Sequence, residues 1–155
     1  MSKPIAVVIL IVSMLFWNSE PMERASYSDE IKSGMCQMTV EEFDLMSRVV
    51  EAESDRTDDL EGRVLIAEVI LNRVESADFA NDITGVCNQS GQFEVVSNGM
   101  IYSVGRTDLS DAAVCEAYRR IQDGEAPNVM YFNNSNYAYG TPYCYEGGNY
   151  FVTVP

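Results

Sequence analysis

One glutamate in this 155-residue sequence lies where a helix would present it on an apolar face. Leu45, Met46, Val49 and Val50 have the spacing of a helical stripe that faces a core, and a further step of four from Val49 reaches Glu53. A carboxyl group on such a face is desolvated, which raises its pKa and lets it stay protonated as a general acid. The spacing alone also allows Glu53 to lie past the helix end in solvent.

The composition excludes most other catalytic chemistry. The sequence contains no histidine, which removes Ser-His-Asp and Cys-His hydrolases and zinc amidases with histidine ligands. It has no Walker-type loop and no Gly-x-Gly-x-x-Gly fingerprint, so nucleotide chemistry has no support. We therefore expect no metal and no cofactor. Carboxylate chemistry remains, and glycosidic bond cleavage requires an acid of this kind.

The helix that carries Glu53 has a clear predicted start. Thr39 followed three residues later by Glu42 is a capping box, and the apolar stripe begins directly after it. Glu51 lies two positions before Glu53 and therefore points to a different side of the helix. Glu53 is thus the exceptional carboxylate of this helix.

A second helix is predicted to lie at the centre of the fold. Asp58 and Glu61 form another capping-box pattern, and the helix they open runs to Val74. Because its residues are apolar over most of the circumference, other elements must cover it on several sides. Glu68 and Arg73 are among its few polar residues, and we interpret them as a solvated or paired edge.

The remaining chain predicts an α+β fold in which helix dominates. Residues 76–107 are punctuated by glycines, which indicates loops and a small β-hairpin. A helix is expected over residues 110–122, with Gly124 directly after its end. Residues 129–132 and 149–152 are rich in aromatic and β-branched side chains and are candidate strands.

The N-terminal part of the chain is expected to direct export. Residues 1–19 place a lysine before a long apolar run, which is the pattern of an export signal or an N-terminal anchor. Residues 20–37 are interpreted as a linker and residues 38–155 as one catalytic domain. The formal net charge of −14 disfavours nucleic acid as a partner. We predict an exported domain that faces outward, with membrane contact only through an uncleaved N-terminal segment.

The four cysteines form an even set with wide spacing, which in an exported chain favours two disulfides. They lack Cys-x-x-Cys pairs and histidine neighbours, so a zinc site is disfavoured. Three pairings are possible. The pairing we expect joins Cys36 with Cys144 and Cys87 with Cys115.

Seven short segments of the chain occur in an informative order and spacing. They begin with Val50-Glu51-Ala52-Glu53 and continue through residues 60–64, 69–74, 91–93, 96–99, 130–132 and 147–151. Together they resemble the SleB-type cortex-lytic cell-wall hydrolases, which have Ala-Glu-Ala, Glu-Gly-Gln and Val-Leu-Asn-Arg at the first three places. The resemblance covers roughly residues 43–152.

This resemblance implies a lysozyme-like fold, related to goose-type lysozymes and resuscitation-promoting factors, with Glu53 as the catalytic acid. The implied activity is that of a lytic transglycosylase on the bond between N-acetylmuramic acid and N-acetylglucosamine. An intramolecular hydroxyl then replaces a second carboxylate. The alternative, a hydrolytic muramidase, would need that second carboxylate from Asp55, Asp58 or Asp59.

By the same resemblance, six residues match positions near the family's groove and are candidates for substrate binding: Glu61, Asn72, Gln92, Phe93, Tyr131 and Asn149. Two departures from the family pattern stand out. Asn149 occupies a position where many members have histidine, and Ser54-Asp55-Arg56 replaces the common Arg-Gly-Glu. The second departure motivates a further alternative, a non-catalytic glycan-binding protein that has lost turnover. Peptidoglycan strands are the expected partner, and a targeting protein is conceivable.

Overall fold

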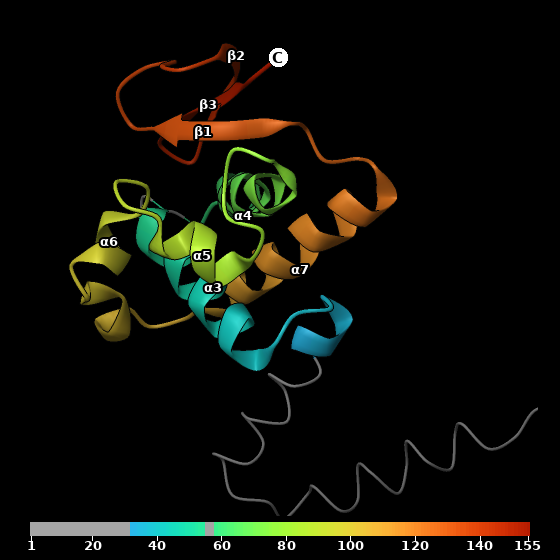
Figure 1. Cartoon of the computed structure of the whole chain (residues 1–155), viewed down its shortest axis with the longest axis vertical. Coiled ribbons are helices and arrows are strands. Elements are labelled where there is room, and N and C mark those ends of the chain that lie inside the picture. Colours follow the sequence, from blue (N-terminus) through green and yellow to red (C-terminus); the bar gives the residue numbers. More distant parts are fainter. Residues whose placement is uncertain (1–31, 55–57) are drawn as a thin grey trace, which may run out of the picture.

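In the computed structural model, which describes residues 32–54 and 58–155, a body of helices carries a small sheet on one side (Figure 1). The predicted export segment, residues 1–19, lies outside the described residues. The predicted linker, residues 20–37, is described from residue 32, and residues 32–35 are helical. Within these described ranges, none of the helices combines the length and the apolar character that a membrane span requires.

Helix α3 (Val40–Glu53) begins at the predicted capping box. The Thr39 hydroxyl accepts the backbone N–H of Glu42, and the Glu42 carboxylate accepts the backbone N–H of Thr39. Val49 and Val50 are fully buried, as the apolar stripe predicts. The helix extends far enough to include Glu53, so this side chain lies in the last helical turn.

Helix α4 (Leu60–Glu75) passes through the middle of the molecule and contacts α3, α5 (Ile83–Asn88), α7 (Asp108–Asp123) and the sheet (Figure 1). Its N-cap is Asp59, whose carboxylate accepts the backbone N–H of Glu61 at 3.0 Å. The predicted cap, Asp58, is therefore wrong by one residue. The shift frees the Glu61 carboxylate from any capping role.

Glu68 and Arg73 of α4, predicted to form a solvated or paired edge, are both buried. Glu68 is fully buried and Arg73 is only 4% exposed. Glu68 faces Arg120 of α7, and Arg73 lies among aromatic rings from other parts of the chain. The solvated alternative is wrong because distant elements cover the sides of the helix that carry these charges, whereas the paired alternative holds for Glu68, which lies 3.5 Å from Arg120.

The region between α4 and α7 contains short helices, and the small β-hairpin predicted for residues 76–107 does not form there. Helix α5 is followed by α6 (Glu94–Ser97) and the 3-10 helix η1 (Met100–Ser103). The Asp82 side chain caps α5 by accepting the backbone N–H of Gly85 at 2.6 Å. Glycines here separate helical turns, which the sequence pattern does not distinguish from hairpin turns.

Helix α7 confirms the predicted third helix. It starts after Thr107, whose hydroxyl accepts the backbone N–H of Ser110, and it stops at Gly124. Gly124 adopts the left-handed conformation with φ of 70°, which glycine permits at little cost.

The sheet consists of β1 (Val129–Asn133), β2 (Thr141–Glu146) and β3 (Asn149–Thr153), and β3 pairs antiparallel with both of the others. The two predicted strands correspond to β1 and β3. Strand β2 was not predicted, because most of its side chains are exposed and its sequence has no alternating apolar pattern. The hairpin of the fold is thus the β2–β3 pair, and the predicted class, a helix-dominant α+β domain with a small hairpin, is confirmed.

The turn between β2 and β3 packs closely on α4. A Cβ atom at Gly62 would lie 2.8 Å from the Cα of Gly147 and 2.7 Å from a carboxylate oxygen of Asp59. Gly147 and Gly148 both have positive φ, as tight hairpin turns require. Glycine at position 62 therefore lets the hairpin turn reach the start of α4.

The predicted disulfide pairing is wrong in this structure. All four cysteines are free thiols, and the Sγ atom of Cys36 lies 3.6 Å from that of Cys115. Cys36 was assigned to Cys144, and Cys115 to Cys87. The helical turn before α3 packs on α7, a tertiary contact that cysteine spacing alone does not specify.

Candidate active site

Glu53 occupies the C-terminal turn of α3, with its side chain half-buried. The Ser54 backbone N–H donates to the Val50 carbonyl, and the Ser54 hydroxyl donates to the Glu51 carbonyl at 2.8 Å. These two bonds complete the end of the helix. The Glu53 carboxyl itself makes no hydrogen bond or ion pair with any residue that the structure describes, so nothing there holds it in its charged form.

Glu51 is engaged elsewhere, as its helical position predicts. Its carboxylate pairs with the buried Arg63 at 3.3 Å and accepts a hydrogen bond from the Thr107 hydroxyl at 2.7 Å. Glu51 therefore joins α3, α4 and the start of α7. Two glutamates separated by one residue thus have different tasks, and only Glu53 is left unpaired.

The surroundings of Glu53 favour its protonated form. Burial raises the pKa of Glu53 above its ordinary value, and the negative charge of Glu94 raises this pKa further. The last turn of α3 contains no basic residue, and the partial negative charge of a helix C-terminus also opposes a carboxylate. A carboxyl group in this setting stays protonated to higher pH than one in solvent, which suits a proton donor.

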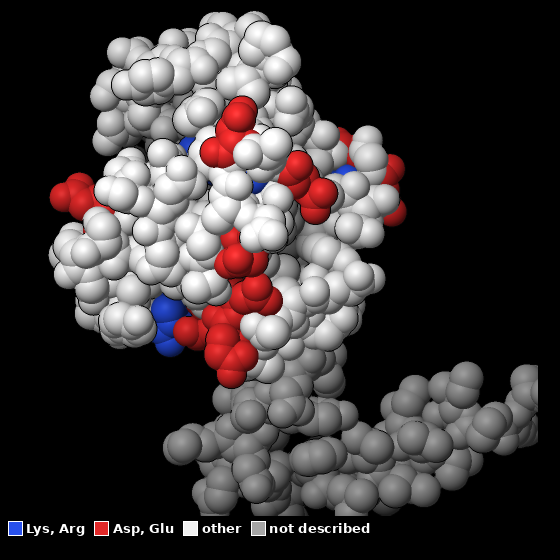
Figure 2. Space-filling view, in the orientation of Figure 1, with Lys and Arg blue, Asp and Glu red and all other residues white. Residues whose placement is uncertain are grey.

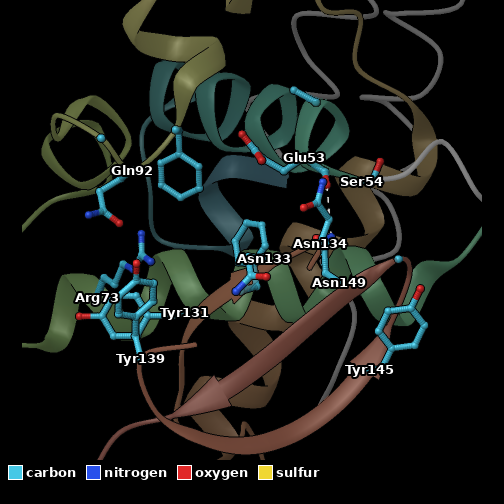
Figure 3. Close-up of a pocket in the computed structure, with 15 residues that line it drawn as sticks. Glu53, Ser54, Arg73, Gln92, Tyr131, Asn133, Asn134, Tyr139, Tyr145 and Asn149 are labelled. Carbon is cyan, nitrogen blue, oxygen red and sulfur yellow. Dashed lines mark hydrogen bonds between the residues drawn. The ribbon is translucent and has the colours of Figure 1, made fainter. Parts of the chain in front are cut away.

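Glu53 opens into a pocket of about 910 Å³. The walls come from the end of α3, the loop before α6, the side of α4 and the sheet with its loops (Figure 3). A volume of this order holds a ligand the size of a short oligosaccharide. The pocket is lined by Ala52, Glu53, Ser54, Arg73, Gly91, Gln92, Phe93, Tyr131, Phe132, Asn133, Asn134, Tyr139, Tyr145, Gly148 and Asn149.

Four of the six predicted substrate-binding residues lie in this pocket with Glu53: Gln92, Phe93, Tyr131 and Asn149. Gln92 and Phe93 stand on the loop that leads into α6, and Phe93 is 2% exposed. The Phe93 ring packs against Phe132 of β1 with ring centroids 6.5 Å apart. Phe93 therefore forms the apolar base of the pocket, between α6 and β1, and Gln92 offers its side-chain amide to a ligand.

Asn149 connects the sheet to the end of α3. It is the first residue of β3 and is 6% exposed. Its side-chain amide donates to the backbone carbonyl of Glu53 at 3.4 Å (Figure 3). The residue thus fixes the position of the helix end, and it does so without an imidazole.

The other two predicted residues lie outside the pocket. The Glu61 carboxylate forms two hydrogen bonds of 2.8 Å with Arg120 on α7. The Asn72 amide donates to the backbone carbonyls of Pro127 and Val129 at 3.0 Å and 2.9 Å, which attaches the start of β1 to α4. Both residues therefore join elements in this structure.

The proposed second carboxylates of a muramidase are not beside Glu53 in the described part of the pocket. Asp59 is the N-cap of α4, Asp58 is exposed outside the pocket, and Asp55 lies outside the described residues. Glu94 is the acid whose charge acts on Glu53. Glu94 is exposed and does not line the pocket.

Sequence reasoning missed several residues that the sheet and its loops add to the pocket. Asn133, Asn134, Tyr139 and Tyr145 all line it. Tyr139 is 82% exposed and has φ of 69°, a left-handed conformation that is rare for a tyrosine. The abundance of tyrosine and asparagine after residue 128 is the available signal, because both side chains suit sugar rings and N-acetyl groups.

The two parts of the molecule around the pocket differ in charge. Residues 128–155, which include all three strands, contain Glu146 as their only charged residue. Figure 2 shows this sheet region as almost uncharged on the visible face, whereas acidic side chains gather on the helical body below it. A neutral, aromatic and amide-rich wall fits a carbohydrate better than a strongly charged ligand.

Sequence comparison relates this chain to enzymes of the bacterial cell wall. Residues 57–153 match the family described as Cell Wall Hydrolase. A spore cortex-lytic enzyme from Bacillus cereus is 35% identical over 99 residues, which is 63% of this chain and 36% of that enzyme. The Bacillus subtilis spore cortex-lytic enzyme is 35% identical over 89 residues, or 57% of this chain and 28% of the enzyme. The chain spans about a third of the length of these curated relatives.

Structural comparison gives the same relationship. The catalytic domain of the Bacillus cereus SleB protein matches with a TM-score of 0.62 and 29% identity, covering 74% of this chain and 91% of that domain. The catalytic domain of a germination-specific lytic transglycosylase, SleB from Bacillus anthracis, matches with a TM-score of 0.58 and 29% identity. That match covers 72% of this chain and 93% of the domain. The similarity thus concerns catalytic domains.

Proposed function

Since this chain belongs to the cell wall hydrolase family, we propose that it cleaves the glycan strands of peptidoglycan and that Glu53 is its catalytic acid. The observation that carries this proposal is the state of Glu53. Its carboxyl group is half-buried, unpaired among the described residues and open to a pocket of amides and aromatic rings. Glycosidic bond cleavage requires a carboxyl group that remains protonated in this way.

The proposed reaction is that of a lytic transglycosylase. Glu53 donates its proton to the glycosidic oxygen between N-acetylmuramic acid and N-acetylglucosamine, and the bond from that oxygen to the muramic C1 breaks. The Glu53 carboxylate then accepts the proton of the muramic C6 hydroxyl while the oxygen of that hydroxyl forms a bond to the muramic C1. The products are a 1,6-anhydromuramic end and a free 4-hydroxyl on N-acetylglucosamine, and Glu53 is protonated again.

Two observations favour this route over hydrolysis. Among the described residues that line the pocket, Glu53 is the only acid, whereas a hydrolase of the usual kind uses two carboxylates that flank the bond. The related domain from Bacillus anthracis is described as a lytic transglycosylase. An internal hydroxyl nucleophile needs no activated water, so one carboxyl group is sufficient.

The other pocket residues have roles that match a sugar chain. The amides of Gln92, Asn133 and Asn149 are placed to bond hydroxyls and N-acetyl groups, and Tyr131 and Tyr145 offer ring faces for pyranose stacking. Peptidoglycan lies outside the cytoplasmic membrane, so this substrate requires export of the domain. Residues 1–19 are the proposed export signal or anchor.

The test is an incubation of the purified protein with peptidoglycan, followed by mass spectrometry of the released muropeptides. Anhydromuramic ends are the expected product, and Glu53→Gln is the inactive control. Reducing muramic ends would instead show that the protein is a hydrolytic muramidase. Intact glycan that the protein still binds would identify a binding protein without turnover, and cleavage between sugar and peptide would contradict glycosidase activity altogether.

A further inference from the structure

We propose that Arg73 forms a subsite for a carboxylate group of the glycan substrate. This inference rests on the proposed function, because it assigns the chemical character of one part of the substrate that Glu53 cleaves. Arg73 lines the same pocket, and among the described lining residues it is the only cation.

The hydrogen bonding of Arg73 is incomplete. Its Nε donates to the backbone carbonyl of Met130 at 2.9 Å, whereas its buried Nη1 atom has no hydrogen-bond partner. No acidic residue in the described part of the chain forms an ion pair with it. A buried guanidinium without a counter-ion is costly, because burial removes the water that would otherwise solvate the charge.

Aromatic rings compensate part of this cost. The Arg73 guanidinium carbon lies 5.0 Å from the centroid of Phe79, 5.6 Å from that of Phe93 and 5.2 Å from that of Tyr131. Such contacts favour a cation, although each is weaker than an ion pair. Burial lowers the pKa of Arg73 to about 10, so the group is still charged at neutral pH. The site therefore holds a positive charge in a low-dielectric setting and lacks the matching anion.

The position of Arg73 shows where that anion would come from. Figure 3 places Arg73 beside Gln92, Tyr131 and Tyr139 toward one end of the pocket, with Tyr145 and Asn149 toward the other and Glu53 between them. The guanidinium points toward Gln92, so a glycan chain that extends from Glu53 toward this end would bring its substituents close to Arg73. A carboxylate arriving there would gain a charge-assisted hydrogen bond in a site that excludes much of the water.

Peptidoglycan offers carboxylates from two sources. The lactyl group of N-acetylmuramic acid has a free carboxylate where no peptide is attached, and the stem peptide has carboxylates where one is attached. Both present the same planar anion to a guanidinium. Neutral glycans of N-acetylglucosamine alone offer neither.

The test uses the full chain with Glu53→Gln, which prevents turnover, and measures glycan affinity by calorimetry. One ligand is a peptide-free tetrasaccharide of alternating N-acetylglucosamine and N-acetylmuramic acid, and the second is the same glycan with its lactyl carboxylates reduced to alcohols. A third has stem peptides attached. At low salt we expect a ligand with carboxylates to bind at least about tenfold more tightly than the reduced ligand. The first and third ligands distinguish the lactyl from the peptide source.

Two substitutions at Arg73 and one control substitution then test whether Arg73 causes this preference. Arg73→Met in the same protein should abolish it, Arg73→Lys should retain part of it, and Arg119→Met should leave it unchanged. Arg119 is the matched control because it lies on α7, pairs with Glu116, Asp123 and Glu125, and changes the net charge equally.

Equal affinity for the carboxylate and reduced forms would overturn the subsite while leaving the proposed function intact. A preference that survives Arg73→Met in a folded protein would also overturn it. If no glycan binds at all, the proposed function fails and the subsite fails with it. If Arg73→Met does not fold, the comparison of ligands on the parent protein still decides whether the pocket prefers a carboxylate.

Discussion

The pocket around Glu53 and the interface around Glu68 both contain a desolvated glutamate, but only one of them is open. Glu53 lies at the end of α3 and borders a cavity. Glu68 lies in the middle of α4, is fully buried, and has neither carboxylate oxygen in a hydrogen bond. Its nearest cation is Arg120 of α7, 3.5 Å away.

Burial raises the pKa of both glutamates, and for Glu68 the value rises to about 7. The charges of Glu61 and Glu116 raise the pKa of Glu68, and Arg120 opposes this effect. A raised pKa therefore does not identify the catalytic group. A catalytic acid needs desolvation together with access for a substrate, and only the region around Glu53 provides both.

The largest expected difference between the two regions appears when each glutamate is replaced separately by glutamine. Glu53→Gln should reduce glycan cleavage by about a thousandfold or more, because Glu53 is the only carboxylic acid among the described residues that line the pocket. Glu68→Gln, the same change in the closed region, should retain activity. Turnover of peptidoglycan by both variants measures this difference, with circular dichroism to establish that each is folded. An active Glu53→Gln variant would end the assignment of that residue.

The second prediction concerns stability around Glu68. The folded-state pKa of Glu68 lies above that of an unfolded glutamate, so the protonated group contributes stability at low pH. This stability is lost as pH rises from about 4.5 through about 7. The loss amounts to about 3 kcal/mol of the free energy of unfolding once the group is fully ionised. Glu68→Gln should remove this loss, because the glutamine side chain stays uncharged in this buried position at every pH.

Urea unfolding at pH 5 and pH 8 checks this prediction. The variant should match the wild type at pH 5 and be more stable at pH 8. Arg120 would keep Glu61 and Glu116 as partners, so its own charge remains paired. A variant that is less stable than the wild type at pH 8 would mean that the ion pair with Arg120 outweighs the desolvation of Glu68.

The two regions also show which features could be predicted from the sequence. The helix that carries Glu53 depends on a capping box and on apolar residues four positions apart, and both are local patterns. The strands β1 and β3 are predictable for a similar reason, because their aromatic and β-branched residues lie close together in the chain. Local patterns therefore predicted the helix on which Glu53 lies, and the family resemblance assigned its proposed catalytic role.

The features that were missed depend on contacts between distant residues. Arg73 is covered by the rings of Phe93 and Tyr131, which lie on a loop and a strand distant from it in the sequence. The neighbour of Cys36 is Cys115 because the segment before α3 packs on α7. Likewise, Glu61 turns toward Arg120 and away from the pocket, which depends on how α4 and α7 are oriented. Spacing in one sequence contains no information on such orientations.

A smaller effect is expected where the sheet supports the open region. Asn149→Ala removes the hydrogen bond to the Glu53 carbonyl and should reduce turnover by about tenfold, since the end of α3 would no longer be held. Its cost in stability should be only about 1 kcal/mol. Asn136→Ala, at an exposed position of the loop after β1, is the matched control and should leave both quantities unchanged. Steady-state rates and thermal melts give the two measurements, and an unchanged rate for Asn149→Ala would leave Asn149 without a positioning role.

The smallest effect tests whether charge adds to burial in the open region as it does in the closed one. The negative charge of Glu94 raises the pKa of Glu53, so Glu94→Gln should lower that pKa, and only slightly because Glu94 is exposed and its charge is screened by solvent. Because the acid must be protonated, cleavage declines as pH rises through this pKa. The alkaline limb of the pH–rate profile should therefore move to lower pH in the variant, and more so at low salt. Glu41→Gln changes the net charge equally at an exposed position at the start of α3 and should leave the limb in place. If both variants shift the limb alike, the net charge of the protein acts on Glu53, and Glu94 has no special position. If neither variant shifts the limb, burial alone raises the pKa of Glu53.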